Sequence, residues 1–162
     1  MKGFTLIEIL VALLILSFML VGIYTVLNYG YSTYSNELGL LDLQQQARRA
    51  MDGMIREIRQ TNESAGQGNL SIPSASTIIF NIPPDTFGLA WIGPITYYLD
   101  TVEGRIVREY PAGTLHPVAG DISGLIFSQS GDIINIEFTC AKTVNRRDLS
   151  ITVKGQVRLR NE

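Results

Sequence analysis

Residues 1–30, MKGFTLIEILVALLILSFMLVGIYTVLNYG, decide how this chain is organised. Between Ile9 and Leu27 the apolar side chains are interrupted only by a serine, a glycine and a threonine, and none of these is charged. At about 1.5 Å per residue, a helix from Phe4 to Leu27 would be about 36 Å long, enough to cross a hydrocarbon core of about 30 Å. Because a backbone in lipid must bond its own polar groups, we expect this segment to be helical.

Glu8 lies one helical turn inside this apolar run, where a carboxylate is unfavourable. A charge at mid-membrane costs about 2.5–3.5 kcal/mol, and less near the end of a helix. A secretory signal peptide has a shorter apolar region and a small-residue cleavage site after it, and this sequence matches neither feature. A plain N-terminal anchor would fit the length of the run but would leave Glu8 unexplained.

The residues from Lys2 to Glu8, KGFTLIE, followed by the apolar run ILVALLI, resemble the prepilin motif of type IV pilins and type II secretion pseudopilins. The resemblance implies that a prepilin peptidase cleaves after Gly3 and methylates the new N-terminus at Phe4. It also implies that Glu8 takes part in subunit assembly by pairing with the N-terminal amine of a neighbouring subunit. Glycine at the cleavage position adds no side chain that would obstruct a protease, and Lys2 favours a cytoplasmic N-terminus.

The helix is expected to continue beyond the membrane, because no proline occurs before Pro73. After residue 36, apolar side chains recur every three or four positions, which predicts one buried helix face. That face comprises Leu40, Ala47, Met51, Met54 and Ile58. We therefore expect a leader peptide at residues 1–3, a transmembrane and filament-core helix at 4–30, an amphipathic helix at 31–60 that packs on a sheet, and a β-sheet domain at 61–162.

The C-terminal part of the chain alternates short apolar, β-branched segments with turn residues. Strands are predicted at residues 77–82, 95–100, 105–110, 122–128, 133–139 and 149–159, and residues 61–76 are predicted to be a loop. Glycines at residues 104 and 131 suit hairpin turns. The prediction is an α+β, pilin-like fold, in which a long N-terminal helix packs on one antiparallel sheet.

Individual residues in this domain carry narrower expectations. Ile134, Ile136 and Phe138 alternate with polar residues and should face the core. Cys140 is the only cysteine and ends this alternation, so we expect it to be buried rather than reactive. Gly155 interrupts the last strand and is interpreted as a bulge.

Four tyrosines, Tyr24, Tyr29, Tyr31 and Tyr34, follow or end the apolar run. Their amphipathic rings suit the boundary between membrane and water. For Tyr34, packing against the protein's own domain is the alternative.

Composition and motifs argue against catalysis and against nucleic acid as a partner. The formal net charge is −2, with no dense basic stripe, and Arg146-Arg147 is interpreted as an isolated pair that is either solvated or salt-bridged. The single histidine, His116, is assigned to a loop, and no nucleophile, phosphate-binding or metal-ligand motif occurs. Asp121 and Asp132 could approach each other around a turn and bind calcium, but their spacing does not match an oxygen-ligand loop, so this alternative is disfavoured without being settled. We expect no enzymatic activity, no cofactor and no metal.

Residues 46–60 and 94–110 resemble minor subunits related to the J-type pseudopilin and the PilW-type minor pilin. This resemblance implies a minor subunit that helps initiate or cap a type II secretion pseudopilus or a type IV pilus. The alternative is a membrane-anchored periplasmic binding or sensor domain that never polymerises. Secretion, pili and DNA uptake all stay open as the process served.

The partners implied are other minor and major pilins or pseudopilins, the prepilin peptidase, the inner-membrane assembly platform and the lipid bilayer. The expected location is the bacterial inner membrane, crossed once, with the C-terminal domain in the periplasm and the subunit incorporated at or near a filament tip.

Overall fold

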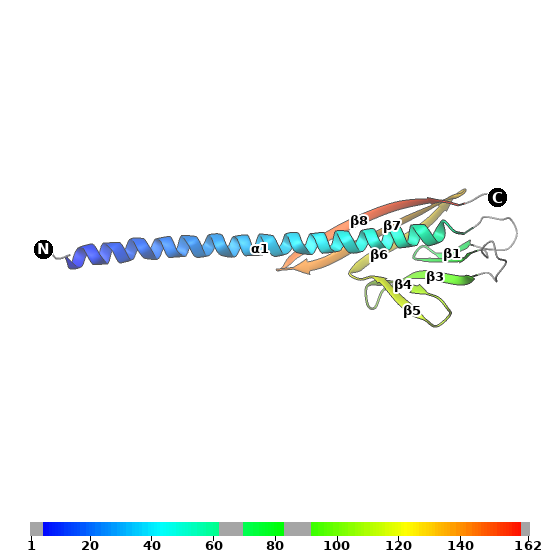
Figure 1. Ribbon diagram of the computed structural model, residues 1–162, viewed down its shortest axis with the longest axis horizontal. Helices are drawn as coiled ribbons and strands as arrows, with labels where there is room; N and C mark the ends of the chain where they lie inside the picture. Colours follow the sequence, from blue (N-terminus) through cyan, green and yellow to red (C-terminus); the bar gives the residue numbers. More distant parts are fainter. Residues whose placement is uncertain (1–4, 62–69, 83–91, 160–162) are drawn as a thin grey trace.

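One long helix and eight strands make up the computed structural model, which describes residues 5–61, 70–82 and 92–159. The helix α1 (Leu6–Ile58) is far longer than the β domain, and its N-terminal half extends away from it (Figure 1). All neighbouring strands are antiparallel. The predicted α+β, pilin-like architecture is confirmed.

The N-terminal half of α1 is built for an apolar environment. It is long and apolar enough to cross a membrane, and its most apolar window buries none of its residues against the rest of the protein. The hydroxyl of Ser17 donates to the Leu13 carbonyl at 2.7 Å, and that of Thr25 donates to the Val21 carbonyl at 2.8 Å. These local bonds satisfy the polar side chains of the run within the helix itself, as lipid requires.

The C-terminal half of α1 packs against the sheets through one face. Its buried residues follow the spacing of a single helix face: Leu43, Ala47, Ala50, Met51, Met54 and Ile58. The predicted face is therefore correct from Ala47 onward, but Leu43 is fully buried where Leu40 was expected to be. Leu40 is half-buried because it lies at the edge of the β domain nearest the N-terminal half of α1, where it lines a groove together with Leu149.

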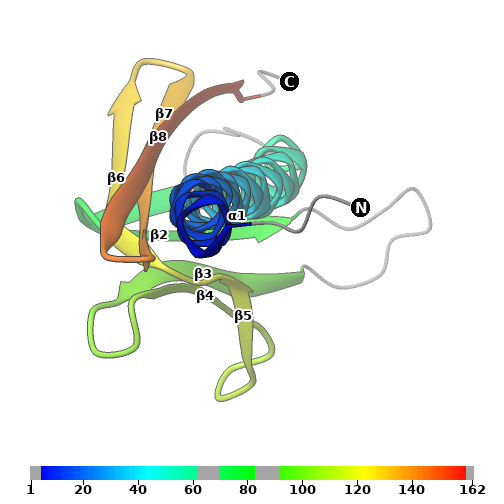
Figure 2. The ribbon, with the colours of Figure 1, turned by 90° about the vertical axis from the view of Figure 1, so that its left-hand side faces the viewer.

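The strands form two sheets rather than the single sheet predicted. The five-stranded sheet has the order β1 (Leu70–Ser74), β2 (Thr77–Ile82), β3 (Ile92–Asp100), β4 (Arg105–Glu109), β5 (Leu115–Ala119). The three-stranded sheet comprises β6 (Ile122–Ser130), β7 (Ile133–Val144) and β8 (Arg147–Arg158). Viewed along α1, the helix lies in the angle between the two sheets (Figure 2).

The break between the sheets lies at Asp121, which joins β5 to β6. Asp121 has a φ of 57°, in the left-handed region that non-glycine residues seldom adopt. The chain turns sharply there instead of pairing β6 with β5. The two sheets nevertheless share one hydrophobic core with α1, to which Ile95 of β3 and Ile136 of β7 both contribute.

Two strands were missed in the sequence. β1 lies within the predicted loop, and β5 places His116 on a strand instead of in a loop. Both are short edge strands of the five-stranded sheet, and each contains a proline, Pro73 and Pro117. Proline removes a backbone donor, which an edge strand tolerates, so the sequence signal for these strands is weak.

The three-stranded sheet confirms the predicted alternation. Ile134, Ile136 and Phe138 are buried, and so is Cys140. The Gly155 bulge is wrong, because β7 and β8 stay in continuous register and Gly155 lies opposite Ile136. A Cβ at residue 155 would overlap the sulfur of Met51, so α1 packs against the sheet here with no room for a side chain larger than that of glycine.

Candidate functional site

Of the three residues predicted to carry processing and assembly, the structure describes one. Gly3 and Phe4 lie outside the described residues. Glu8 lies in the first turn of α1 and is exposed. Its surroundings can therefore be compared with the role that the sequence assigns to it.

Glu8 caps its own helix. Oε2 of Glu8 accepts a hydrogen bond from the backbone N–H of Thr5 at 2.9 Å and one from the Thr5 hydroxyl at 3.0 Å. In return the Thr5 hydroxyl oxygen accepts from the Glu8 backbone N–H at 3.3 Å. This reciprocal capping box satisfies the first donors of the helix, and it gives Glu8 a local function that sequence reasoning overlooked, although the Thr-x-x-Glu spacing signals it.

The capping box uses only one carboxylate oxygen. Both bonds from Thr5 reach Oε2, and no residue within the described ranges donates to Oε1. A carboxylate has two oxygens and about four acceptor sites. Glu8 can therefore cap α1 and accept a cationic donor from another chain at the same time.

The tyrosine band consists of Tyr24, Tyr29, Tyr31 and Tyr34, which lie on α1 at the end of the apolar run and in the segment that follows it. The four residues are 63–76 % exposed. Tyr34 is the least exposed of them, yet it does not pack on the β domain as the alternative reading required. The side chains of the tyrosine band therefore point to the surroundings of the helix and are not covered by the β domain.

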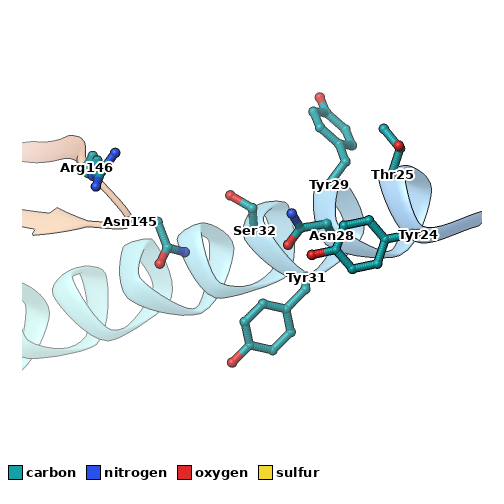
Figure 3. Close-up of a pocket in the computed structure, with 8 residues that line it drawn as sticks. All are labelled: Tyr24, Thr25, Asn28, Tyr29, Tyr31, Ser32, Asn145 and Arg146. Carbon is teal, nitrogen blue, oxygen red and sulfur yellow. The ribbon is translucent and has the colours of Figure 1, made fainter. Parts of the chain in front are cut away.

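The tip of the β7–β8 hairpin meets α1 next to this band (Figure 3). The side-chain amide of Asn145 donates to the Ser35 hydroxyl oxygen at 2.6 Å. Between the hairpin tip and α1 lies a groove of about 650 Å³. It is lined by Asn145 and Arg146 of the tip and by six helix residues: Tyr24, Thr25, Asn28, Tyr29, Tyr31 and Ser32. The sequence analysis missed this turn, because it ended one strand at residue 139 and began the next at residue 149, whereas β7 and β8 are separated only by Asn145 and Arg146.

A polar cluster joins α1 to the five-stranded sheet. The Glu57 carboxylate accepts from Arg108 Nε at 2.9 Å and from the Tyr97 hydroxyl at 2.9 Å. The Arg108 guanidinium also lies 5.5 Å from the ring centre of Tyr110. Glu57 thus ties the end of the helix to β3 and β4.

The charges in this cluster depend on one another. Burial and the adjacent Glu57 charge raise the pKa of Tyr97, which therefore stays a hydrogen-bond donor. Burial alone would lower the pKa of Arg108, but the hydrogen bond that Arg108 donates to Glu57 and the negative charge of Glu57 outweigh burial and raise that pKa. The arrangement is a structural clamp, because one carboxylate of α1 accepts hydrogen bonds from side chains of two neighbouring strands.

Among the described residues, no group of three or more His, Cys, Asp and Glu side chains could hold a metal ion. Asp121 and Asp132 do not converge. Lys142 lies 3.7 Å from Asp121, whereas Arg158 lies 2.6 Å from Asp132 and lowers the pKa of that carboxyl. Burial and the nearby Asp121 charge raise the pKa of Cys140 to about 11, so its thiol is protonated at neutral pH.

Comparison with known proteins gives one match. The family model described as the prokaryotic N-terminal methylation motif matches residues 1–24. No curated protein and no solved structure matches the chain.

Proposed function

We infer that this chain, which carries the prokaryotic N-terminal methylation motif of type IV pilin-like prepilins, is a structural subunit that assembles with other pilins into a filament. The match to the motif over residues 1–24 carries the inference. A helix that fits a single-pass inner-membrane anchor, followed by antiparallel sheets, supports it. The motif and fold suggest a structural rather than an enzymatic protein.

Processing is the first step of the proposed function. A prepilin peptidase would cut after Gly3 and methylate the amine of Phe4, on the cytoplasmic side of the inner membrane. Intact mass of the membrane-extracted protein tests this step in a host with an active peptidase. The mature chain should lack residues 1–3 and carry one methyl group, and Gly3→Leu should keep the leader. A wild-type chain that retains residues 1–3 would refute the proposal.

Assembly through Glu8 is the second step. We propose that Glu8 Oε1 accepts the N-terminal amine of a neighbouring subunit within the membrane, while Oε2 keeps the Thr5 cap. A carboxylate in lipid is stabilised only when it is paired or neutralised. The N-terminal amine of a second subunit lies within about one helical turn of the membrane depth of Glu8, because both belong to the same N-terminal segment. That amine is therefore the nearest available cation.

Because Glu8 also caps α1, a test must separate the two roles. Glu8→Gln keeps the capping box, which accepts either side chain, but removes the charge. Thr5→Ala removes the cap but keeps the charge. Breaking a buried ion pair costs about 3–5 kcal/mol. We therefore expect Glu8→Gln to insert normally but to lower the filament count more than tenfold, and Thr5→Ala to assemble filaments.

The opposite pattern would show that Glu8 matters as a cap alone. Normal filament numbers in Glu8→Gln cells would refute the pairing. A third outcome is that the wild-type chain and both variants accumulate in the membrane in the methylated form and never enter filaments. In that case the chain is a non-polymerising anchored domain.

We propose further that the subunit is a minor one, placed just beneath the filament tip with its β domain in the periplasm. The resemblance of residues 46–60 and 94–110 to minor subunits supports this placement. A subunit at the very tip would have no subunit above it and would need no assembly glutamate, whereas this chain has Glu8. Co-purification of the processed chain with other minor subunits, lost in Glu8→Gln, is the expected result. Uniform incorporation of the chain along the whole filament would contradict the placement beneath the tip.

A further inference from the structure

The β7–β8 hairpin tip lies close to the level where the apolar run of α1 ends. Asn145 at the tip bonds to Ser35, and Ser35 follows Leu27 by about 12 Å along the helix axis, at about 1.5 Å per residue. The groove below the tip continues toward the membrane as far as Tyr24. If the apolar run spans the bilayer, as the proposed function requires, this groove begins at the edge of the hydrocarbon core and extends through the headgroup layer.

The residues that line the groove carry positive charge and no negative charge. Arg146 is the only charged residue among those that line it, and no acidic side chain faces it. Arg146 and Arg147 are exposed, and neither forms an ion pair with any residue in the described ranges. The nearby acids, Glu37 and Asp148, line a separate groove on the side of Arg147, and Asp148 accepts a bond there from the Thr143 hydroxyl at 2.6 Å.

Arg146 occupies a backbone position that suits glycine better. Asn145 and Arg146 have φ values of 49° and 63°, and they form the two central residues of the hairpin turn between Val144 and Arg147. Turns with two positive φ values prefer Asn-Gly. An arginine is therefore held at this position against its backbone preference, and its side chain lies at the end of the groove formed by the hairpin tip, with Asn145 and Ser32 between it and the tyrosines (Figure 3).

We propose that the groove between the tyrosine band and the hairpin tip binds the headgroup of an anionic phospholipid in the periplasmic leaflet. A guanidinium can grip a phosphate with two parallel hydrogen bonds. Asn28 and Ser32 line the groove and supply neutral donors for the rest of the headgroup. Tyr24 and Tyr29 supply rings that suit the membrane–water interface. The lipid would fix how deeply the subunit sits before it enters a filament.

The test uses the full chain reconstituted in phosphatidylcholine nanodiscs in which the fraction of phosphatidylglycerol is raised stepwise. Amide NMR signals of Asn145 and Arg146 report the tip. We expect a saturable shift with phosphatidylglycerol that weakens in 0.5 M salt, because screening reduces the attraction. Each arginine near an anionic surface contributes about 1 kcal/mol, so Arg146→Gly should raise the half-saturating fraction about fivefold.

Three variants separate charge from structure. Arg146→Gly removes the charge and relaxes the turn, so loss of binding cannot follow from a misfolded hairpin. Arg146→Lys keeps the charge and should bind nearly as well as wild type. Arg59→Gln makes the same charge change as Arg146→Gly about 48 Å beyond Leu27 along the helix, and it should leave the titration unchanged.

Several outcomes would overturn the inference. A tip whose signals ignore phosphatidylglycerol, or an Arg146→Gly variant that titrates like wild type, shows that the groove does not bind the lipid. The same shift produced by inorganic phosphate in pure phosphatidylcholine nanodiscs identifies a site for small anions instead. A shift that follows the number of chains per disc identifies a subunit contact. Failure of the chain to insert at all would contradict the proposed function itself.

Discussion

Gly155→Ala tests how closely α1 approaches the three-stranded sheet. A Cβ at residue 155 would overlap the sulfur of Met51 and would lie 3.1 Å from Ile55 Cδ1. Met51 is only 5 % exposed, so its side chain has little room to move away. Overpacking of this kind costs about 1–3 kcal/mol, whereas replacing a strand glycine by alanine gains about 0.5–1 kcal/mol through the backbone. We expect a net loss of about 1–2 kcal/mol.

The assay is thermal unfolding of the full chain in a mild detergent, followed by near-ultraviolet circular dichroism. For a β domain of this size, 1 kcal/mol corresponds to a Tm shift of about 4–8 °C. Gly124→Ala is the matched control, because Gly124 also lies in a strand but has no atom within 4 Å of an added Cβ. It should leave the Tm unchanged or raise it slightly.

A double-mutant cycle with Met51→Ala identifies the cause. If the clash is with Met51, Gly155→Ala should cost little in the Met51→Ala background, giving a coupling energy of about 1 kcal/mol or more. A Gly155→Ala variant as stable as the Gly124→Ala control would refute the close approach. An equal loss in both Met51 backgrounds would place the clash elsewhere.

Three further predictions concern the core, the clamp and the thiol. Met54→Ala should destabilise the β domain by about 2–5 kcal/mol, because Met54 is fully buried, whereas Leu41→Ala, at a position 51 % exposed, should change the free energy of unfolding by less than about 0.5 kcal/mol. Glu57→Gln should cost about 1–2 kcal/mol, since it leaves the half-buried Arg108 without its anion and both groups keep some solvent screening. Cys140 should resist alkylation at pH 8 until the domain unfolds. The pKa of the Cys140 thiol is about 11 in the folded protein, above the ordinary value of 9.0. The stabilisation that the buried, protonated thiol provides should therefore be intact below about pH 9 and be lost as the pH rises to about 11. Measuring the free energy of unfolding at a series of pH values would test this.

A capping box at the first turn changes how the acidic residue of the motif is read. From the sequence, Glu8 had no local partner and its presence in an apolar run pointed only to another subunit. In the structure Thr5 supplies a partner within the same chain. Loss of filaments in a Glu8→Ala variant would therefore be ambiguous, since alanine removes cap and charge together. Glu8→Gln with Thr5→Ala as its counterpart resolves the two roles.

Local patterns in the sequence were enough to predict the helix and most of the hairpins. An apolar run followed by a three-to-four spacing predicts one long helix, because both signals act within a few turns of the same segment. Gly104 and Gly131 adopt φ values of 59° and 61°, so the turns that they mark depend on their own backbone freedom. Burial of Cys140 followed from the two-residue period of its strand.

Tertiary structure decided what depends on residues far apart in the chain. The split into two sheets depends on how the chain turns at Asp121, and no periodic pattern in the sequence signals that turn. The role of Gly155 follows from a helix about a hundred residues earlier, whose Met51 occupies the space of a Cβ. The groove beside the tyrosine band likewise exists only because Asn145 folds back onto Ser35. Such contacts are set by packing and not by local propensity, so the sequence alone predicted the helix and six of the eight strands but not the surfaces where they meet.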